Sequence, residues 1–205
     1  MGGMNNPGDF RLPYTDLLAQ ARVGPESVHQ HLRRELPYLW LDQYLEMTPR
    51  ETNILVFPHG TFDYLYDDYA SLEATGVVEP DGVTEARLVA AVGISRPSQR
   101  SRDDARLRGW VGPTGRTFGD AWDKGHFIAH SIGGAVDGLE ANVFLQLRRV
   151  NRGGYRQMER YCAGNPGVLC FARPLYDDPS ARPAQVEFGV LKTDGELWVE
   201  RFANR

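Results

Sequence analysis

The sequence predicts an α+β fold, with a mixed or antiparallel sheet core and an N-terminal helical segment. Apolar residues recur at three- and four-residue steps before residue 48, which is typical of helices. Alternating apolar and polar residues follow residue 168, which is typical of strands. The 22 Gly and 13 Pro among 205 residues indicate many turns and argue against a helical bundle.

The helical pattern divides into three short segments, over residues 13–23, 24–36 and 37–47. Pro25 and Pro37 stand where helices can begin, because a proline fits the first turn of a helix. We therefore expect three helices. We interpret residues 1–50 as a helical extension packed on the core, which residues 51–205 form.

Two apolar runs in the next part of the chain predict strands, a short buried one over residues 53–57 and another over residues 87–94. The aromatic and acidic residues 58–69 fit neither pattern. Their carboxylates favour an exposed acidic loop over a second metal site, and the residues concerned are Asp63, Asp67 and Asp68.

The second half of the chain predicts a long polar loop over residues 95–125 and a short strand over residues 126–134 that ends in a Gly-Gly turn. A helix is expected over residues 155–163. Three strands close the chain, and Asp194-Gly195 predicts a hairpin between the last two; the strands are expected over 168–176, 184–192 and 196–202.

Composition excludes several classes of protein. With 41% hydrophobic and 24% charged residues, the chain has the composition of an ordinary globular protein. No apolar run approaches the roughly 18–20 residues needed to span a bilayer. No secretory signal is visible at the N-terminus, so we expect a cytoplasmic protein as this chain stands.

Charge is distributed unevenly along the chain. Residues 96–160 carry twelve Arg or Lys and seven Asp or Glu, whereas the whole chain has a net charge of −4. A basic middle in an acidic chain is the electrostatic pattern that phosphate groups favour, although a solvated surface also explains it.

One stretch of this basic region combines residue types that suit a hard cation. His126 follows a glycine, and Asn142 and Gln146 are amides four residues apart. Asn151 stands shortly before a Gly-Gly pair, and Glu159 follows later in the expected helix. Magnesium prefers oxygen ligands and keeps several waters, so one or two protein oxygens suffice. A histidine can then take the proton of an attacking water, because its reference pKa lies near working pH.

The segment resembles the DNA/RNA non-specific endonucleases, which carry a ββα-metal (His-Me) finger. Their first element is matched by Asp123-Lys124-Gly125-His126, the second by Asn142 and Gln146, and the third by Asn151-Arg152-Gly153 with the later Glu159. The resemblance covers about forty residues and implies a finger over about 118–163 within an endonuclease-like domain.

The resemblance implies a role for each matched residue. His126 would be the general base, and Asn151 would be the direct Mg²⁺ ligand. Glu159 would hold or orient metal-bound water, although an ion pair with a neighbouring arginine is the alternative. Asn142 and Gln146 would build the local hydrogen-bond frame or simply close a loop.

Two residues of the segment depart from the family pattern. Lys124 replaces the usual arginine and loses its planar paired donors. Leu145 stands where the family often has proline. Asp123 and Gly125 match the pattern and would support the geometry of the motif.

Several basic residues are candidates for contacts with phosphate. The family uses an upstream arginine in the transition state, and Arg96 and Arg100 are the first candidates here, with Arg116 third. Lys124, Arg116 and Arg152 would contact the substrate phosphates.

Together these features predict a Mg²⁺-dependent nuclease, with Mn²⁺ or another divalent cation as a substitute, that hydrolyses DNA, RNA or both with little sequence preference. Some domains of this kind are toxin modules, so an immunity or inhibitor protein, delivery to another cell and a homodimer are further expectations. No membrane partner is expected.

Two other functions stay open at this point. The first is a catalytically silent nuclease-like module that binds nucleic acid or a protein partner. The second is a Cys–His hydrolase that uses Cys162 or Cys170, although both thiols lie in apolar sequence without an activating base. We interpret the two cysteines as buried thiols, with a disulfide as the alternative.

Overall fold

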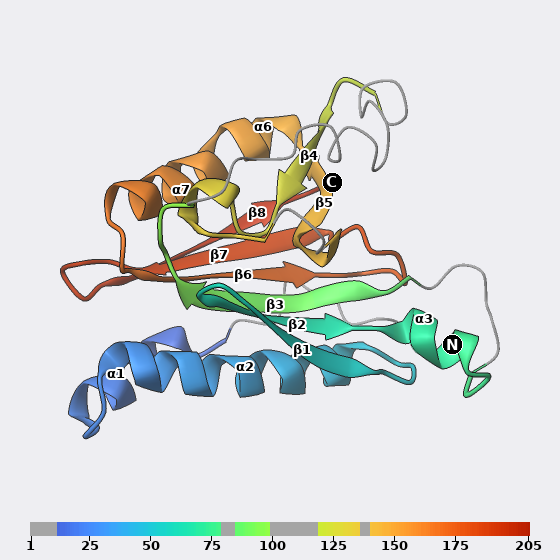
Figure 1. Ribbon diagram of the computed structural model, residues 1–205, viewed down its shortest axis with the longest axis horizontal. Coiled ribbons are helices and arrows are strands. Elements are labelled where there is room, and N and C mark those ends of the chain that lie inside the picture. The colour runs from blue at the N-terminus through green and yellow to red at the C-terminus, as the bar shows by residue number, and fades with distance from the viewer. Residues whose placement is uncertain (1–11, 79–84, 99–118, 136–139) are drawn as a thin grey trace.

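The computed structural model of the chain describes residues 12–78, 85–98, 119–135 and 140–205 (Figure 1). It confirms the α+β class. In chain order the longer elements are α1 (Tyr14–Val23), α2 (Val28–Met47), β1 (Ile54–His59), β2 (Phe62–Asp67), α3 (Tyr69–Ala74), β3 (Arg87–Ile94), β4 (Trp122–His126), β5 (Val143–Leu147), α6 (Arg148–Arg152), α7 (Gly154–Gly164), β6 (Leu169–Leu175), β7 (Gln185–Leu191) and β8 (Leu197–Ala203).

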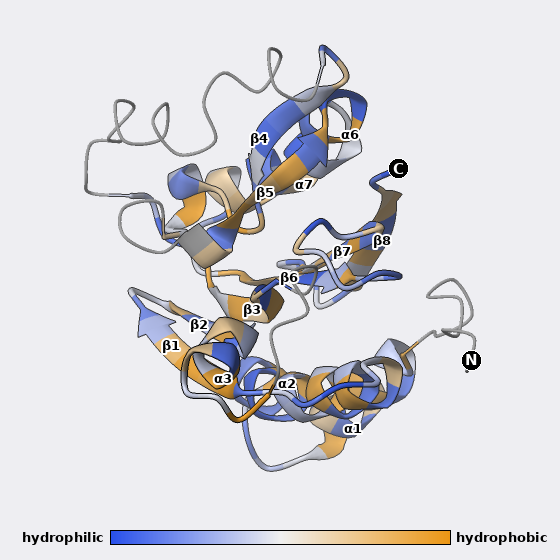
Figure 2. Cartoon of the chain, turned by 90° about the vertical axis from the view of Figure 1, so that its right-hand side faces the viewer, coloured by the Kyte–Doolittle hydropathy of each residue, from blue (hydrophilic) through white to orange (hydrophobic). Residues whose placement is uncertain are grey.

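The molecule has three layers around one antiparallel sheet, whose strand order is β1-β2-β3-β6-β7-β8. Helices α1 and α2 cover one face, and the β4–β5 hairpin with α6 and α7 covers the other (Figure 2). Each face has its own apolar cluster. Trp40 and Phe171 belong to the cluster on the α2 side, and Phe144 and Tyr155 belong to the cluster on the hairpin side.

The N-terminal segment forms two helices, so the expectation of three was wrong. Helix α2 begins after Ser27, whose side chain forms a capping box with Gln30, and it runs through Pro37 without a break. Proline removes one helical hydrogen bond, but burial of Leu36 and Trp40 on the adjoining turns favours one continuous helix. No described helix is both long and apolar enough to cross a membrane.

The strand expected to be buried at residues 53–57 is the edge strand β1, and its Val56 and Phe57 side chains are exposed. The unassigned residues 58–69 contain β2, which lies between β1 and β3. The interpretation of these residues as an exposed acidic loop was wrong, because Asp63 and Asp67 both lie in the strand β2. Asp67 is 0% exposed and pairs with Arg50, and Asp63 is half-buried and pairs with Arg33. Asp68 follows the strand and is half-buried.

The strand expected to begin at His126 ends there instead. β4 starts at Trp122, inside the expected loop, and residues 130–132 form a short 3-10 helix. The sequence prediction failed because Trp122-Asp123-Lys124-Gly125 has little apolar character of its own. Backbone pairing with β5 provides the strand structure that side-chain pattern does not indicate.

The strand expected over residues 87–94, the helix expected over 155–163 and the three closing strands are confirmed, whereas most of the loop expected over 95–125 lies outside the described residues. β3 coincides with the strand expected at residues 87–94, and α7 spans the helix expected at 155–163. The last three expected strands are β6, β7 and β8. Gly195 has φ of +82° in the turn between β7 and β8, a backbone conformation that glycine adopts without strain.

The α2–sheet contact predicts a large difference between two leucines of the same helix. Leu36 is 0% exposed, whereas Leu45 is 44% exposed. We expect Leu36→Ala to lower the free energy of unfolding by about 2–5 kcal/mol, because a buried cavity remains, and Leu45→Ala to lower it by less than about 1 kcal/mol. Urea unfolding measures both values, and equal losses would contradict this packing.

Candidate functional site

The residues of the predicted finger lie on one hairpin and the helices that follow it. β4 and β5 pair antiparallel, with Asp123 opposite Gln146 and His126 opposite Val143. α6 follows β5 directly and carries Asn151, and α7 then carries Glu159. The order of these elements is strand, strand, helix, which is the order that the ββα resemblance implies.

Asp123 is the centre of a polar cluster that joins β4 to α6. Its carboxylate accepts hydrogen bonds from Arg148 Nε at 3.1 Å and from Arg152 Nε and Nη2 at 2.9 and 3.2 Å. Asn151 Nδ2 donates to the same carboxylate at 3.2 Å. The structure therefore brings together Asp123, Asn151 and Arg152, as members of one network.

This network fixes the orientation of Asn151. Partial burial raises the pKa of Asp123, but the hydrogen bonds from Arg152, Asn151 and Arg148 have the larger combined effect. The pKa of Asp123 therefore lies below its ordinary value. Asp123 therefore stays ionised at neutral pH as the acceptor for Asn151 Nδ2. Because the amide nitrogen is held there, the amide oxygen turns away from Asp123 and remains an available oxygen donor for a cation.

Gly125 is required by the side chain of Gln146. A Cβ atom at Gly125 would lie 2.2 Å from Gln146 Oε1 and 2.6 Å from Gln146 Cβ, so any larger residue would displace that glutamine. Gln146 is 1% exposed, and neither its amide oxygen nor its amide nitrogen has a hydrogen-bond partner among the described residues. A buried amide of this kind needs a polar neighbour, such as water or a ligand.

Asn142 closes the segment between β4 and β5. Its Oδ1 accepts from Ile128 N at 2.9 Å, and its Nδ2 donates to the carbonyl oxygens of Ile128 and Ala135 at 2.8 and 2.5 Å. The side chain is completely buried. Asn142 therefore holds the turn after His126 in place by bonds to the backbone.

His126 is half-buried at the end of β4, whereas the Asn151 amide lies beside Asp123 near the beginning of that strand. Three residues along an antiparallel strand span about 10 Å. Alternation along β4 places Lys124 and His126 on one face of the hairpin and Asp123 on the other. Burial lowers the pKa of Lys124.

Glu159 lies on α7, largely withdrawn from solvent. Burial raises its pKa to about 7, and the nearby charge of Arg156 counteracts this only in part. No ion pair joins Glu159 to Arg156 or Arg160 within the described ranges, although a pair with one of them was the alternative to a metal role. A carboxylate in this setting gains stability from a proton or a cation nearby.

The arginine candidates are only partly described. Arg96 follows β3 with an exposed side chain, and its backbone N–H donates to Ile132 O at 3.0 Å, so it lies beside the segment that follows β4. Arg100 and Arg116 lie outside the described residues. Arg152 makes a forked ion pair with Asp123, so a role in phosphate binding would require that pair to open or to be shared.

The donor set fits a magnesium-type cation better than zinc. No group of three His, Cys, Asp or Glu that could hold a metal occurs in the described part of the chain. The Asn151 amide oxygen and the Glu159 carboxylate are hard oxygen donors, which Mg²⁺ and Mn²⁺ accept together with waters. The chemistry of these two donors therefore fits a divalent cation that prefers oxygen ligands.

Sequence analysis missed Arg148, which shares Asp123 with Arg152. Its neighbour Arg149 has the same chemistry, so the sequence offers no signal that separates them. The two cysteines are buried free thiols. A hydrogen bond with Cys162, together with burial, raises the pKa of Cys170 well above its ordinary value, which argues against a Cys–His hydrolase.

Comparisons with known proteins assign no family. No family model and no curated protein matches the chain. The solved structure of Sda1 nuclease with bound zinc ion aligns at 16% identity and a TM-score of 0.38, over 80% of this chain and 81% of that chain. An extracellular endonuclease aligns at 12% identity and a TM-score of 0.33, over 77% and 80% of the two chains. An extracellular nuclease aligns at 10% identity and a TM-score of 0.31, over 77% of this chain and 87% of that chain.

Burial of Glu159 predicts a pH-dependent stability in the absence of metal. The folded pKa of about 7 lies above the unfolded value, so the folded state binds the extra proton and loses stability as the pH rises from about 4.5 to 7. The loss is on the order of 3 kcal/mol at most. We expect Glu159→Gln to gain stability relative to the wild type between pH 5 and pH 8.

Urea unfolding in excess EDTA at both pH values measures this difference. Glu46→Gln is the matched control, because Glu46 is exposed on α2. If Glu159→Gln and the wild type show the same change in unfolding free energy with pH, the described burial of Glu159 is wrong.

Proposed function

We propose that this protein is a metal-dependent nuclease that hydrolyses phosphodiester bonds of DNA, RNA or both, with His126 as general base and Asn151 as metal ligand. The observation that carries the proposal is the hydrogen bond from Asn151 to Asp123, which joins the first and third motif elements within a hairpin–helix unit. The sequence distance between these two residues is 28 positions, so chance proximity in the chain does not explain their contact.

Each residue has a distinct task in the proposed reaction. An imidazole nitrogen of His126 accepts the proton of the water that attacks phosphorus. Asp123 orients Asn151, and Glu159 offers a second oxygen donor. A bound divalent cation would supply positive charge to the scissile phosphate and the leaving 3′ oxygen. Lys124 and Arg96, with Arg100 and Arg116 as further candidates, would contribute positive charge around the substrate phosphates.

His126 and the Asp123–Asn151 pair lie at different ends of β4, so the proposed mechanism requires the substrate phosphate to lie between them. His126 must reach the attacking water, and a cation held by Asn151 would contact oxygen atoms of the same phosphate. The toxin role, an immunity partner and a homodimer stay predictions from the resemblance.

Removal of the proposed base tests the mechanism. We expect His126→Ala to slow nicking of circular plasmid DNA and cleavage of structured RNA by about 10²–10⁴-fold, because the attacking water then lacks a proton acceptor. The matched control is His29→Ala on α2, which should cleave at the wild-type rate. Full activity of His126→Ala would remove this residue from the reaction.

Binding and cleavage by the wild-type protein separate the nuclease from the silent alternative. If the wild-type protein binds nucleic acid in a salt-sensitive manner and never cleaves it, with or without Mg²⁺, the protein is a nuclease-like binding module.

Metal removal is the second test. We expect excess EDTA to abolish cleavage and Mg²⁺ or Mn²⁺ to restore it. Loss of a residue that only supports a metal ligand lowers metal affinity by roughly 10–100-fold. We expect Asn151→Ala to raise the Mn²⁺ concentration needed for half-maximal cleavage by more than this factor. Calorimetric titration of Mn²⁺ provides a readout that does not depend on activity. Gln157→Ala, exposed on α7, is the control. Undiminished cleavage in EDTA would contradict a metal-dependent reaction.

A further inference from the structure

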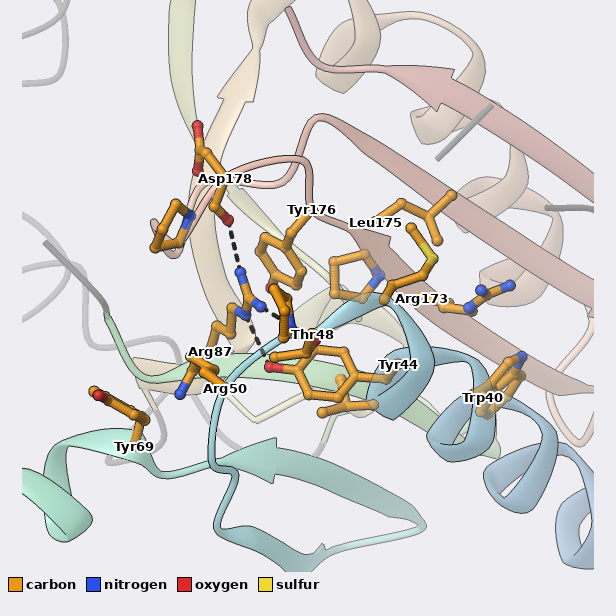
Figure 3. Close-up of a pocket in the computed structure, with 15 residues that line it drawn as sticks. Trp40, Tyr44, Thr48, Arg50, Tyr69, Arg87, Arg173, Leu175, Tyr176 and Asp178 are labelled. Atoms are coloured by element: carbon orange, nitrogen blue, oxygen red, sulfur yellow. Dashed lines mark hydrogen bonds between the residues drawn. The ribbon is translucent and has the colours of Figure 1, made fainter. Parts of the chain in front are cut away.

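A second site lies on the face of the sheet that the finger does not cover. A pocket of about 230 Å³ opens between the end of α2, the loop that follows it, β3 and the end of β6 (Figure 3). Arg50 and Arg87 lie toward one end of it, and Trp40 and Arg173 toward the other, with Tyr44 and Tyr176 between them (Figure 3). The motif residues of the finger do not contribute to this pocket.

A β-bulge in β3 directs Arg87 into the pocket. Leu65 pairs with Ala90, but the next residue of β2, Tyr66, pairs with Leu88, so Val89 is the extra residue. The bulge reverses the alternation of side chains on its N-terminal side. Leu88 consequently joins the apolar cluster on the finger side, and Arg87 faces α2.

Among the described residues, the positive charge of Arg87 is buried without an acidic partner. The side chain is 6% exposed, and its hydrogen bonds go to neutral groups, Tyr44 Oη at 2.8 Å, the Asp178 carbonyl at 2.8 Å and Thr48 Oγ1 at 3.4 Å. No carboxylate of the described residues lies within ion-pair distance of it. A buried charge without a counterion is costly, so this site favours an anion.

The nearby carboxylates are already engaged by other groups. Asp67 is fully buried and accepts from Arg50, Tyr44 and the Asn53 backbone. The Asp178 side chain binds Ser180 and Arg205 and faces away from Arg87. Neither carboxylate therefore forms a direct ion pair with Arg87.

Arg173, at the other end of the pocket, differs from Arg87 because it forms an ion pair. Its Nη1 donates to Glu187 Oε2 at 2.8 Å, and the same carboxylate also pairs with Arg201. Among the described residues, Arg173 therefore has a direct acidic partner and Arg87 has none.

Aromatic rings surround that end. The Arg87 guanidinium lies 4.4 Å from the Tyr176 ring centroid and 5.3 Å from that of Tyr44. Arg50 lies 4.1 Å over the Tyr69 ring, and its Nε has no hydrogen-bond partner among the described residues. These rings partly stabilise the cations but provide no hydrogen-bond acceptor for the remaining N–H groups.

We propose that this pocket binds a small organic anion, whose carboxylate or phosphate group pairs with Arg87 and whose apolar part extends toward Leu175 and Trp40. Both oxyanions match the planar donor group of an arginine. The volume of about 230 Å³ corresponds to that of roughly eight water molecules, which is too little for a nucleic-acid strand. The site is independent of the proposed nuclease activity.

Calorimetric titration tests the proposal with three probes, benzoate, phenyl phosphate and inorganic phosphate, at constant ionic strength and in excess EDTA. Benzyl alcohol is the neutral control. We expect saturable 1:1 binding of benzoate or phenyl phosphate, at least tenfold weaker binding by Arg87→Met, and no saturable binding of benzyl alcohol. The probe that binds more tightly identifies the head group, and weaker binding of inorganic phosphate supports the apolar part.

Three further variants keep the test decisive if Arg87→Met does not fold. Met47→Trp fills the pocket from its half-buried edge and leaves the hydrogen bonds of Arg87 intact, so it should weaken binding at least tenfold. Arg33→Met removes an arginine that pairs with Asp63 at the surface, and it should bind like the wild type. His126→Ala should also bind like the wild type, whatever its nuclease activity.

Two results would overturn the proposal. One is the absence of saturable binding of every anion at millimolar concentration. The other is equal affinity of the wild type and Met47→Trp, which would show that the anion binds elsewhere on the protein.

Discussion

The structure depends on one constraint, which is that the central strands β3 and β6 are buried on both faces. Every residue from Arg87 to Gly93 and from Leu169 to Leu175 is buried. An antiparallel sheet commonly has one solvated face, so a sheet with buried central strands needs cover on both sides. Helices α1 and α2 provide one cover, and the β4–β5 hairpin with α7 provides the other.

The same constraint explains how a small hairpin–helix unit can hold its polar side chains in a fixed arrangement. An isolated hairpin of two five-residue strands is marginally stable at best. Here Phe127 and Phe144 stack with ring centroids 4.1 Å apart, and Tyr155 Oη donates to the Phe127 carbonyl at 2.7 Å. These contacts anchor the hairpin to α7 and to the sheet. Asp123 then has only to orient Asn151 on a support that is already rigid.

Local signals were sufficient where a local preference and the final packing agree. The Asp194-Gly195 turn and the order of the motif elements could be predicted for that reason. Local signals failed where burial overrides them, as at Pro37 within α2. They also failed where the partner is distant in sequence. The contact between Asp67 and Arg50, like that between Arg148 and Asp123, depends on strand pairing that neither residue type indicates.

The bulge at Val89 shows how a single backbone feature determines the chemistry of both faces. If Val89 were an ordinary paired residue of β3 instead of a bulge, strict alternation would turn Arg87 toward the finger-side cluster that contains Tyr64 and Phe188, and Leu88 toward α2. A buried guanidinium in that apolar cluster would lack the Tyr44 hydroxyl and the Asp178 carbonyl, so the finger would lose part of its support. The bulge thus separates a charged pocket from the apolar layer beneath the finger, because adjacent residues of one strand then serve opposite faces.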